Sequence, residues 1–278
     1  MNILERIDRR ILYLVLLLAV AYPLLRPFGL SVKPGPDSKQ VFRVIDELPR
    51  GSVVMVSFDY DPAAAPELDP MAVALVRLLF SKDLRIITFS QPGWELGAGQ
   101  ADRILRQVAV EKGKEYGTDW VNLGWRAGQS AVILPAMSED LRRPMNGVDM
   151  YGQPLVNLKL MDQIRKLSDL QLIVGIWSGT PGFQEYISFV YEPLKIPLVG
   201  GTTAIGLPVA KPYMKAGQLA GILGGMRGAA DIEVLADQPG RALTVMDAQS
   251  LGLLVILGFL VLGNIGYLVT RWRGGVKG

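Results

Sequence analysis

The last thirty residues contain the feature that most limits what this chain can become. The run Leu251–Val269 is nineteen residues long and carries no charge, and Arg271 and Arg273 follow it closely. A helix rises about 1.5 Å per residue, so about twenty apolar residues cross a hydrocarbon core of about 30 Å. We therefore expect a C-terminal transmembrane helix over residues 248–270, followed by a basic cytoplasmic tail over residues 271–278.

The N-terminal apolar run is shorter and allows two interpretations. Residues Ile11–Leu25 are fifteen uncharged residues flanked by Arg10 and Arg26. The long arginine side chains can reach the two interfaces, so that a short helix still spans. The alternative is a cleaved signal peptide, because a basic start, an apolar stretch and the Ala-Val-Ala sequence at 19–21 have that form. We favour an N-terminal transmembrane anchor within residues 1–30.

The positive charge of the chain lies in its two ends. The net charge is +3. Residues 31–245 hold 22 Lys and Arg against 23 Asp and Glu, so all of the excess positive charge lies in residues 1–30 and 246–278. A near-neutral centre offers no basic surface to a phosphate backbone, and nucleic acid is not an expected partner. Basic residues beside apolar runs mark the cytoplasmic side of a membrane. We expect the lipid bilayer as a partner, both termini in the cytoplasm, and an extracytoplasmic domain over residues 36–240.

The chain contains neither cysteine nor histidine. Disulfides, Cys/His zinc sites and every catalytic dyad or triad that uses an imidazole are therefore excluded. Carboxylates, hydroxyls, lysines and backbone amides remain as the groups available for chemistry. We expect no cofactor and no metal site.

Between the two apolar runs, strand-like and helix-like patterns alternate. An uninterrupted apolar run is typical of a strand covered on both faces, and helices between strands supply the crossovers that parallel pairing requires. We expect an α/β fold: a three-layer α/β/α domain with a mostly parallel, Rossmann-like sheet. The expected strands are Val53–Phe58, Leu84–Phe89, Ala131–Leu134, Leu170–Ile176 and Pro197–Val199. The expected helices are 41–48, Met71–Phe80 after an Asp69-Pro70 cap, Ala98–Tyr116, Leu155–Leu167, Phe183–Tyr191 and Pro212–Leu235, with a loop over 136–154.

Polar and glycine-rich segments follow the expected strands. In sheets of this kind, ligands bind outside the carboxyl ends of the strands, so these side chains are expected to converge on one edge. Short turns and helix caps use the same residue types, and that interpretation stays open. The candidate ligand-binding residues are Asp59, Asp61, Ser90, Ser178, Thr180, Thr202 and Thr203.

Asp59-Tyr60-Asp61 directly follows the first expected strand. An Asp-x-Asp at this place resembles the nucleophile loop of haloacid-dehalogenase-type phosphatases and the metal-binding motif of nucleotide-sugar glycosyltransferases. The phosphatase resemblance implies Asp59 as the nucleophile, Asp61 as the acid–base and Ser90 as a phosphate contact. It also implies that later strands of the sheet end in carboxylates, which complete a magnesium site. In this chain, the later expected strands are followed by serines and threonines instead. The glycosyltransferase resemblance implies a nucleotide donor, which is scarce outside the cell.

Two groups of glycines are candidates for close helix packing. Glycine costs about 1 kcal/mol relative to alanine inside a helix, so several within the expected helix Pro212–Leu235 need a packing reason. Contacts within the domain and contacts between subunits both supply one. In the C-terminal span, an amide between glycines favours contact with another transmembrane helix. The candidate packing residues are Gly217, Gly221, Gly224, Gly225 and Gly228 in the first group, and Gly263, Asn264 and Gly266 in the second.

These features lead to two functional hypotheses. The first is a membrane-anchored, extracytoplasmic α/β domain that acts without catalysis as a binding or assembly subunit of a membrane complex or homo-oligomer. Its partners would be other membrane-protein subunits or further copies of itself. The alternative is an extracytoplasmic, phosphatase-like hydrolase that depends on the carboxylates of Asp59 and Asp61.

Overall fold

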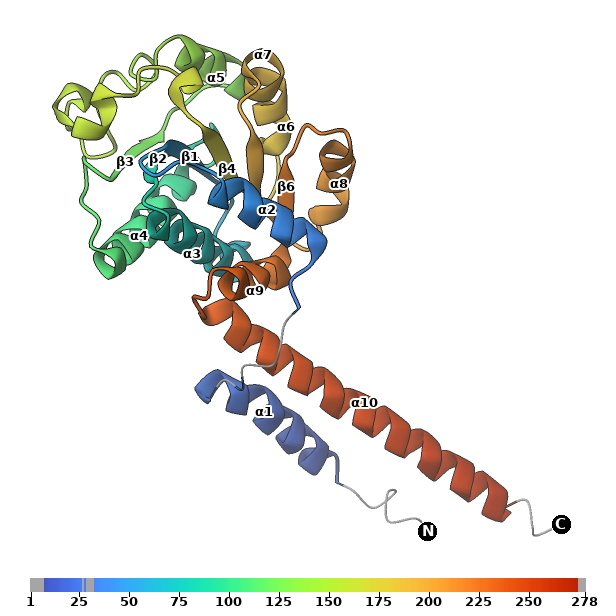
Figure 1. Ribbon diagram of the computed structural model, residues 1–278. Helices are drawn as coiled ribbons and strands as arrows, with labels where there is room; N and C mark the ends of the chain where they lie inside the picture. Colours follow the sequence, from blue (N-terminus) through green and yellow to red (C-terminus); the bar gives the residue numbers. More distant parts are fainter. Residues whose placement is uncertain (1–7, 27, 29–32, 275–278) are drawn as a thin grey trace. The chain divides into compact units, whose positions relative to one another are not determined.

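The computed structural model describes residues 8–26, 28 and 33–274 (Figure 1). The chain divides into two compact units. One is an α/β domain formed by Val32–Ala242. The other is formed by residues 1–31 and 243–278, and its described parts are helical.

Six parallel strands form the sheet of the domain, in the order β3-β2-β1-β4-β5-β6. This is the strand order of a Rossmann-type sheet, in which the direction of winding reverses between β1 and β4. The predicted α/β class and parallel sheet are therefore confirmed. The strands are β1 (Val53–Asp59), β2 (Arg85–Ser90), β3 (Trp120–Trp125), β4 (Leu172–Trp177), β5 (Leu198–Thr202) and β6 (Gly221–Gly224).

Helices cover both faces of the sheet (Figure 1). One face carries α2 (Pro36–Asp46), α3 (Ala65–Ser81), α4 (Glu95–Lys112) and α9 (Gly225–Leu235). The other carries α5 (Ser130–Glu139), α6 (Phe183–Tyr186), η5 (Ile187–Tyr191), α7 (Glu192–Leu194) and α8 (Leu207–Lys215). The short turns η2 (Leu155–Asn157), η3 (Lys159–Asp162) and η4 (Leu167–Asp169) connect α5 to β4.

Every residue of β1 is buried, because the strand lies between the two helical layers. Val53 and Met55 belong to the core cluster that also contains residues of α5 and α6. Side chains alternate along a strand, so Val54 and Val56 point to the opposite face, toward α3 and α4. Burial on both faces is the physical reason why Ser57 is the only polar residue from Val53 to Phe58.

Trp177, the last residue of β4, is fully buried and lies flat along the sheet. A Cβ atom added to Gly175 or to Gly200 would overlap its indole ring. The indole ring also contacts the rings of Phe183 and Tyr186, at ring-centre distances of 5.8 and 6.3 Å. Two glycines in adjacent strands therefore make the space that this large side chain occupies.

The third strand is not where the sequence predicts it. Ala131–Leu134 lies within α5, and β3 is the segment 120–125, for which the sequence predicts no structure. A run of four apolar residues is too short for its period to separate strand from helix. The polar Asn122 and the left-handed Gly124 (φ +76°) interrupt the pattern of the true strand.

Several predicted helix boundaries are also wrong. The helix predicted at Met71 begins at Ala65, because Pro66 occupies its first turn. The helix predicted over Ala98–Tyr116 ends at Lys112, where Gly113 adopts the left-handed conformation (φ +64°) that closes a helix. The helix predicted over Leu155–Leu167 is the series of short turns η2, η3 and η4.

The predicted helix Pro212–Leu235 does not exist as one element. The segment contains the end of α8, the strand β6 and the helix α9. Gly217 lies in a turn with φ +74°, Gly221 and Gly224 belong to β6, and Gly228 belongs to α9. The glycines therefore share no helical stripe. Gly217 has open space around it and serves the turn, whereas Gly221, Gly224 and Gly228 allow close approaches. A Cβ on Gly221 would lie 2.7 Å from Cγ2 of Val41 in α2.

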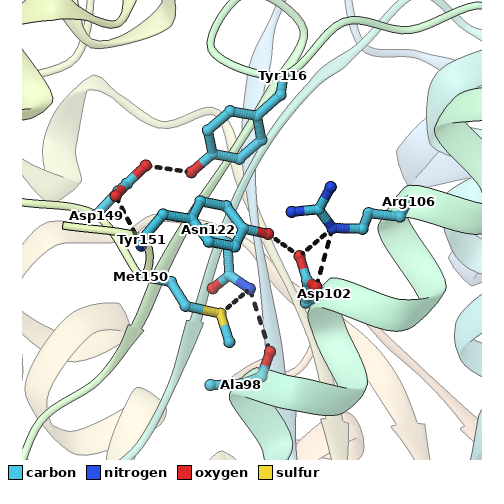
Figure 2. Close-up of polar contacts among 8 residues, drawn as sticks. All are labelled: Ala98, Asp102, Arg106, Tyr116, Asn122, Asp149, Met150 and Tyr151. Atoms are coloured by element: carbon cyan, nitrogen blue, oxygen red, sulfur yellow. Dashed lines mark hydrogen bonds and ion pairs between the residues drawn. The ribbon is translucent and has the colours of Figure 1, made fainter. Parts of the chain in front are cut away.

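Residues 149–151 lie along the outer edge of β3 (Figure 2). The amide of Met150 donates to the carbonyl of Asn122 over 2.9 Å. The Asn122 side chain donates in turn to the carbonyl of Ala98 in α4. The segment thus covers an edge strand that would otherwise present unpaired backbone groups to other chains.

Two tyrosines fasten this segment to the domain (Figure 2). The hydroxyl of Tyr116 donates to Oδ2 of the buried Asp149 over 2.5 Å. The hydroxyl of Tyr151 donates to Asp102 of α4, and that carboxylate also accepts from Arg106 at 3.0 Å. The predicted loop over 136–154 therefore begins inside α5 and ends as a tethered cover of the sheet edge.

The second unit contains α1 (Arg9–Leu25) and all but the first two residues of α10 (Arg241–Gly274). The amide of Phe28 donates to Asp247 over 2.9 Å, and a Cβ on Gly252 would lie 3.2 Å from Cγ2 of Val20. Within the described residues, α10 is the one helix long and apolar enough to cross a membrane, over Arg241–Val269. α1 has 17 residues, at the lower end of the about 17–25 residues that a spanning helix uses.

The fit of Trp177 over its glycines yields a stability prediction. Gly175→Ala is expected to destabilise the domain by about 1–3 kcal/mol, because the added methyl overfills a packed core. Gly99→Ala is the matched control: Gly99 is exposed in α4 with nothing within 4 Å of a new Cβ, so that variant is expected to be as stable or slightly more stable. Chemical denaturation of the full chain in detergent, followed by circular dichroism, measures both. Equal stability of the two variants would contradict the packing described.

Candidate functional site

The carboxyl edge of the sheet holds the candidate ligand-binding residues. Asp59 ends β1, Ser90 ends β2, Thr202 ends β5, and Ser178 directly follows β4. Their environments differ, because Asp59, Ser90 and Thr202 are buried, whereas Asp61 and Thr180 are exposed. These residues therefore lie at the same edge of the sheet but do not line a single cavity.

Asp59 is the centre of a buried hydrogen-bond network. Its carboxylate accepts from the hydroxyl of Ser57 at 2.5 Å, from the amide of Gln91 at 2.8 Å and from the side-chain nitrogen of Gln91 at 2.9 Å. The Gln91 side chain also donates to the carbonyl of Gly182 at 3.0 Å. Tyr186 of α6 donates to the Ser57 hydroxyl at 2.8 Å. The network thus joins β1, the loop after β2 and the loop after β4.

Burial raises the pKa of the Asp59 carboxyl from 3.8 to about 7. The hydrogen bonds from Ser57 and Gln91 oppose the increase, and the negative charge of Glu185 adds to it. The network accommodates the added proton, since a protonated Asp59 can donate to Ser57, whose hydroxyl then donates to Tyr186. Burial and the nearby Asp59 charge also raise the pKa of Tyr186 well above its usual value, which keeps its hydroxyl neutral.

Several of the other candidates serve turns and helix starts. Asp61 accepts from the amide of Ala64 at 2.9 Å, just before α3. Thr203 accepts from the amide of Gly206 at 3.2 Å, just before α8. The backbone of Ser178 donates to the carbonyl of Asp59. The turn-and-cap interpretation therefore describes Asp61 and Thr203.

A cleft of about 330 Å³ opens at this edge, on the side of α5 and α6. The loops after three strands form its walls: Pro92 after β2, Gly128–Ala131 after β3, and Thr180–Pro181 after β4. The indole nitrogen of Trp94 donates to the carbonyl of Pro181 over 2.6 Å and so ties two of these walls together. Glu185 and Phe189 also line the cleft. We refer to this space as the edge cleft.

Exposed apolar side chains stand around the same edge. Leu96 lies in the first turn of α4, Val132 in the first turn of α5, and Ile205 in the loop between β5 and α8. Ile205 is 89% exposed, which is unusual for a side chain whose burial is worth about 1.5–3 kcal/mol. Each residue follows the carboxyl end of a parallel strand, so the three lie on one side of the domain.

The arrangement offers little to metal-dependent chemistry. Within the described residues, no group of three or more Asp and Glu side chains lies close enough together to hold a metal ion. The carboxylates that the phosphatase resemblance implies at later strand ends are likewise missing from the sequence. The residues of this edge do not fit a magnesium site.

Sequence reasoning missed the residues that organise this edge. Gln91, Glu185 and Tyr186 are absent from the candidate list, yet they contact or influence Asp59. The position of Ser57 carries a usable signal, since residues i and i+2 of a strand share a face and Ser57 therefore lies beside Asp59. No local pattern places Tyr186, which lies 129 positions from Ser57.

The candidate packing residues of the C-terminal span lie on α10. Asn264 is exposed, and its side-chain nitrogen donates to the carbonyl of Leu260 in the same helix over 2.7 Å. A Cβ on Gly263 would meet no atom within 4 Å. The amide nitrogen of Asn264 is therefore satisfied within its own helix, and α1 does not contact Gly263.

No family model matches the chain, and comparisons with curated proteins and with solved structures give no match.

The raised pKa of Asp59 yields a pH prediction. The folded chain holds the Asp59 proton up to about pH 7, whereas the unfolded chain releases it near pH 3.8, so stability is expected to fall as pH rises between these values. About three units of pKa correspond to at most about 4 kcal/mol. Asp59→Asn is expected to remove this slope, and Asp61→Asn, at an exposed position, to preserve it. Urea titrations of the full chain across this pH range measure the effect; identical slopes in wild type and Asp59→Asn would refute it.

Proposed function

We propose that this protein is a membrane-anchored assembly subunit whose α/β domain lies outside the cytoplasm and binds partner proteins at the carboxyl edge of its sheet. The partners are subunits of a membrane complex or further copies of the chain. The proposed role requires no catalysis. The proposal also includes that α1 spans the membrane and that both termini lie in the cytoplasm.

One observation carries the proposal. At the carboxyl edge, the carboxyl group suited to catalysis is buried and bonded, while the apolar side chains of Leu96, Val132 and Ile205 are exposed. Exposed apolar side chains gain free energy when a partner covers them, at roughly 25 cal/mol per Å². An edge with this distribution is better suited to contact with another protein than to chemistry.

The hydrolase alternative has less support. A nucleophile must reach its substrate, but the Asp59 side chain is fully buried and accepts three hydrogen bonds from the protein. A carboxyl with a pKa of about 7 is also half protonated at neutral pH, which weakens it as a nucleophile. Asp61, the proposed acid–base, is exposed and bonded to the start of α3.

Two observations support the proposed membrane location: the length and composition of α10, and the basic residues at the two ends of the chain. Twenty-three uncharged residues of this helix lie between Asp247 and Arg271, enough for the about twenty that a bilayer requires. The arginines at the end of α10 and at the start of α1 favour the cytoplasm for both termini. The domain between them would then face outward.

The chain has no cysteine, so single cysteines report topology without interference. Gln153→Cys, in an exposed loop of the domain, is expected to react with a membrane-impermeant maleimide in intact cells. Trp272→Cys, at the exposed end of α10, is expected to react only after lysis. The opposite pattern of labelling would exclude the proposed topology.

Assembly is tested by charging one exposed apolar residue at each edge of the sheet. Ile205→Asp, at the carboxyl edge, is expected to weaken the complex isolated in mild detergent by more than about tenfold. Val110→Asp is the matched control: Val110 is 86% exposed near the end of α4, which leads to the amino end of β3. It is expected to leave the complex intact, as is Asp59→Asn. A native-gel pattern unchanged by Ile205→Asp would argue against assembly through this edge.

A further inference from the structure

The edge cleft carries a negative charge, which assembly through apolar contacts does not require. Among the described residues that line it, Glu185 is the one that carries a charge. The neighbouring buried carboxyl, Asp59, is also acidic. No lysine or arginine is among those lining residues, so a ligand charge of positive sign is favoured.

Glu185 is held in place before any ligand arrives. Its Oε2 atom accepts a hydrogen bond from the amide of Gly182 over 2.6 Å. Its Oε1 atom has no hydrogen-bond partner among the described residues. A half-buried carboxylate in a fixed position, with one free oxygen, is a ready acceptor for an ammonium donor.

Phe189 supplies a second element of cation recognition. It lies four residues after Glu185 on a continuous helical segment, and both residues line the cleft. A cation near an aromatic face gains about 0.5–1 kcal/mol at an exposed site. Pro92 and Pro181 add apolar walls for the carbon atoms of a ligand.

Ser130 supplies a third element. It lines the cleft, its side chain is 7% exposed, and its hydroxyl has no hydrogen-bond partner within the described part of the chain. A buried hydroxyl without a partner is costly. The Oγ atom of Ser130 is shielded from solvent, so it can accept from a ligand N–H only when the side chain turns toward the cleft. Ser130 also begins α5, whose dipole is worth about half a positive charge; the full negative charge of Glu185 outweighs it.

We propose that the edge cleft binds a small molecule through a primary ammonium group, with the carboxylate of Glu185 as its counter-ion and the ring of Phe189 beside it. The volume of about 330 Å³ lies at the lower end of the range typical of small-molecule sites and suits a ligand of a few carbon atoms. This inference goes beyond assembly, since it concerns a small-molecule ligand of the single chain.

Fluorine NMR of the full chain in non-ionic detergent, labelled with 5-fluorotryptophan, tests the proposal. Trp94 is hydrogen-bonded to a cleft wall, and a Trp94→Phe variant assigns its resonance. n-Butylammonium is expected to shift this resonance saturably at millimolar concentrations, whereas butyrate and n-butanol are expected to leave it in place. The absence of a saturable shift with n-butylammonium would overturn the proposal. So would a saturable shift with butyrate, which would mean that the helix amides hold an anion.

Variants locate the binding group. In Glu185→Gln, the new side-chain oxygen still accepts from Gly182, so the loop is retained while the charge is lost. This variant is expected to weaken n-butylammonium binding by more than about tenfold. Phe189→Leu is expected to weaken it by about two- to fivefold. Glu95→Gln removes an exposed carboxylate that does not line this cleft and is expected to have no effect. Binding unchanged in Glu185→Gln would contradict the assignment.

Discussion

Parallel strand pairing is the constraint from which the rest of the domain follows. Two adjacent parallel strands cannot be joined by a tight turn, so each connection crosses the sheet as a helix or a long loop. The helices bury both faces, and all carboxyl ends of the strands meet at one edge. The exposed apolar residues, the edge cleft and Asp59 lie together for this reason, although they come from segments far apart in the sequence.

In a sheet with this strand order, the usual ligand crevice lies where the winding reverses, between β1 and β4. In this protein, side chains of the chain itself occupy the position between β1 and β4. Asp59 ends β1 and is bonded to Gln91, while Trp177 ends β4 and lies over two glycines. The open space at this edge is displaced to the side of α5 and α6, where Glu185 faces it. Asp59, with its three hydrogen bonds, joins β1 to the loop after β2 at this place.

The parts of the fold that the sequence predicts are those with strong local signals. Val53–Phe58 is recognisable because burial on both faces leaves only one polar residue, Ser57, in the run. β3 and β6 are not recognisable, because Gly124 interrupts one and glycines form both ends of the other. The glycines of β6 resemble a packing stripe when the segment is assumed to be helical. Their actual role depends on neighbours such as Val41, which no local pattern indicates.

Topology alone predicts which residues share the carboxyl edge, but it does not predict which are accessible. Asp59 and Asp61 are two positions apart, yet one is fully buried and the other is exposed. The difference depends on the long-range contacts of Gln91 and Tyr186. The most direct test of this account is the pKa of Asp59, measured from its carboxyl ¹³C chemical shift in the full chain. A titration midpoint near pH 7 is predicted for the buried, bonded group. A midpoint near pH 4, the value of a carboxyl in water, would contradict the account.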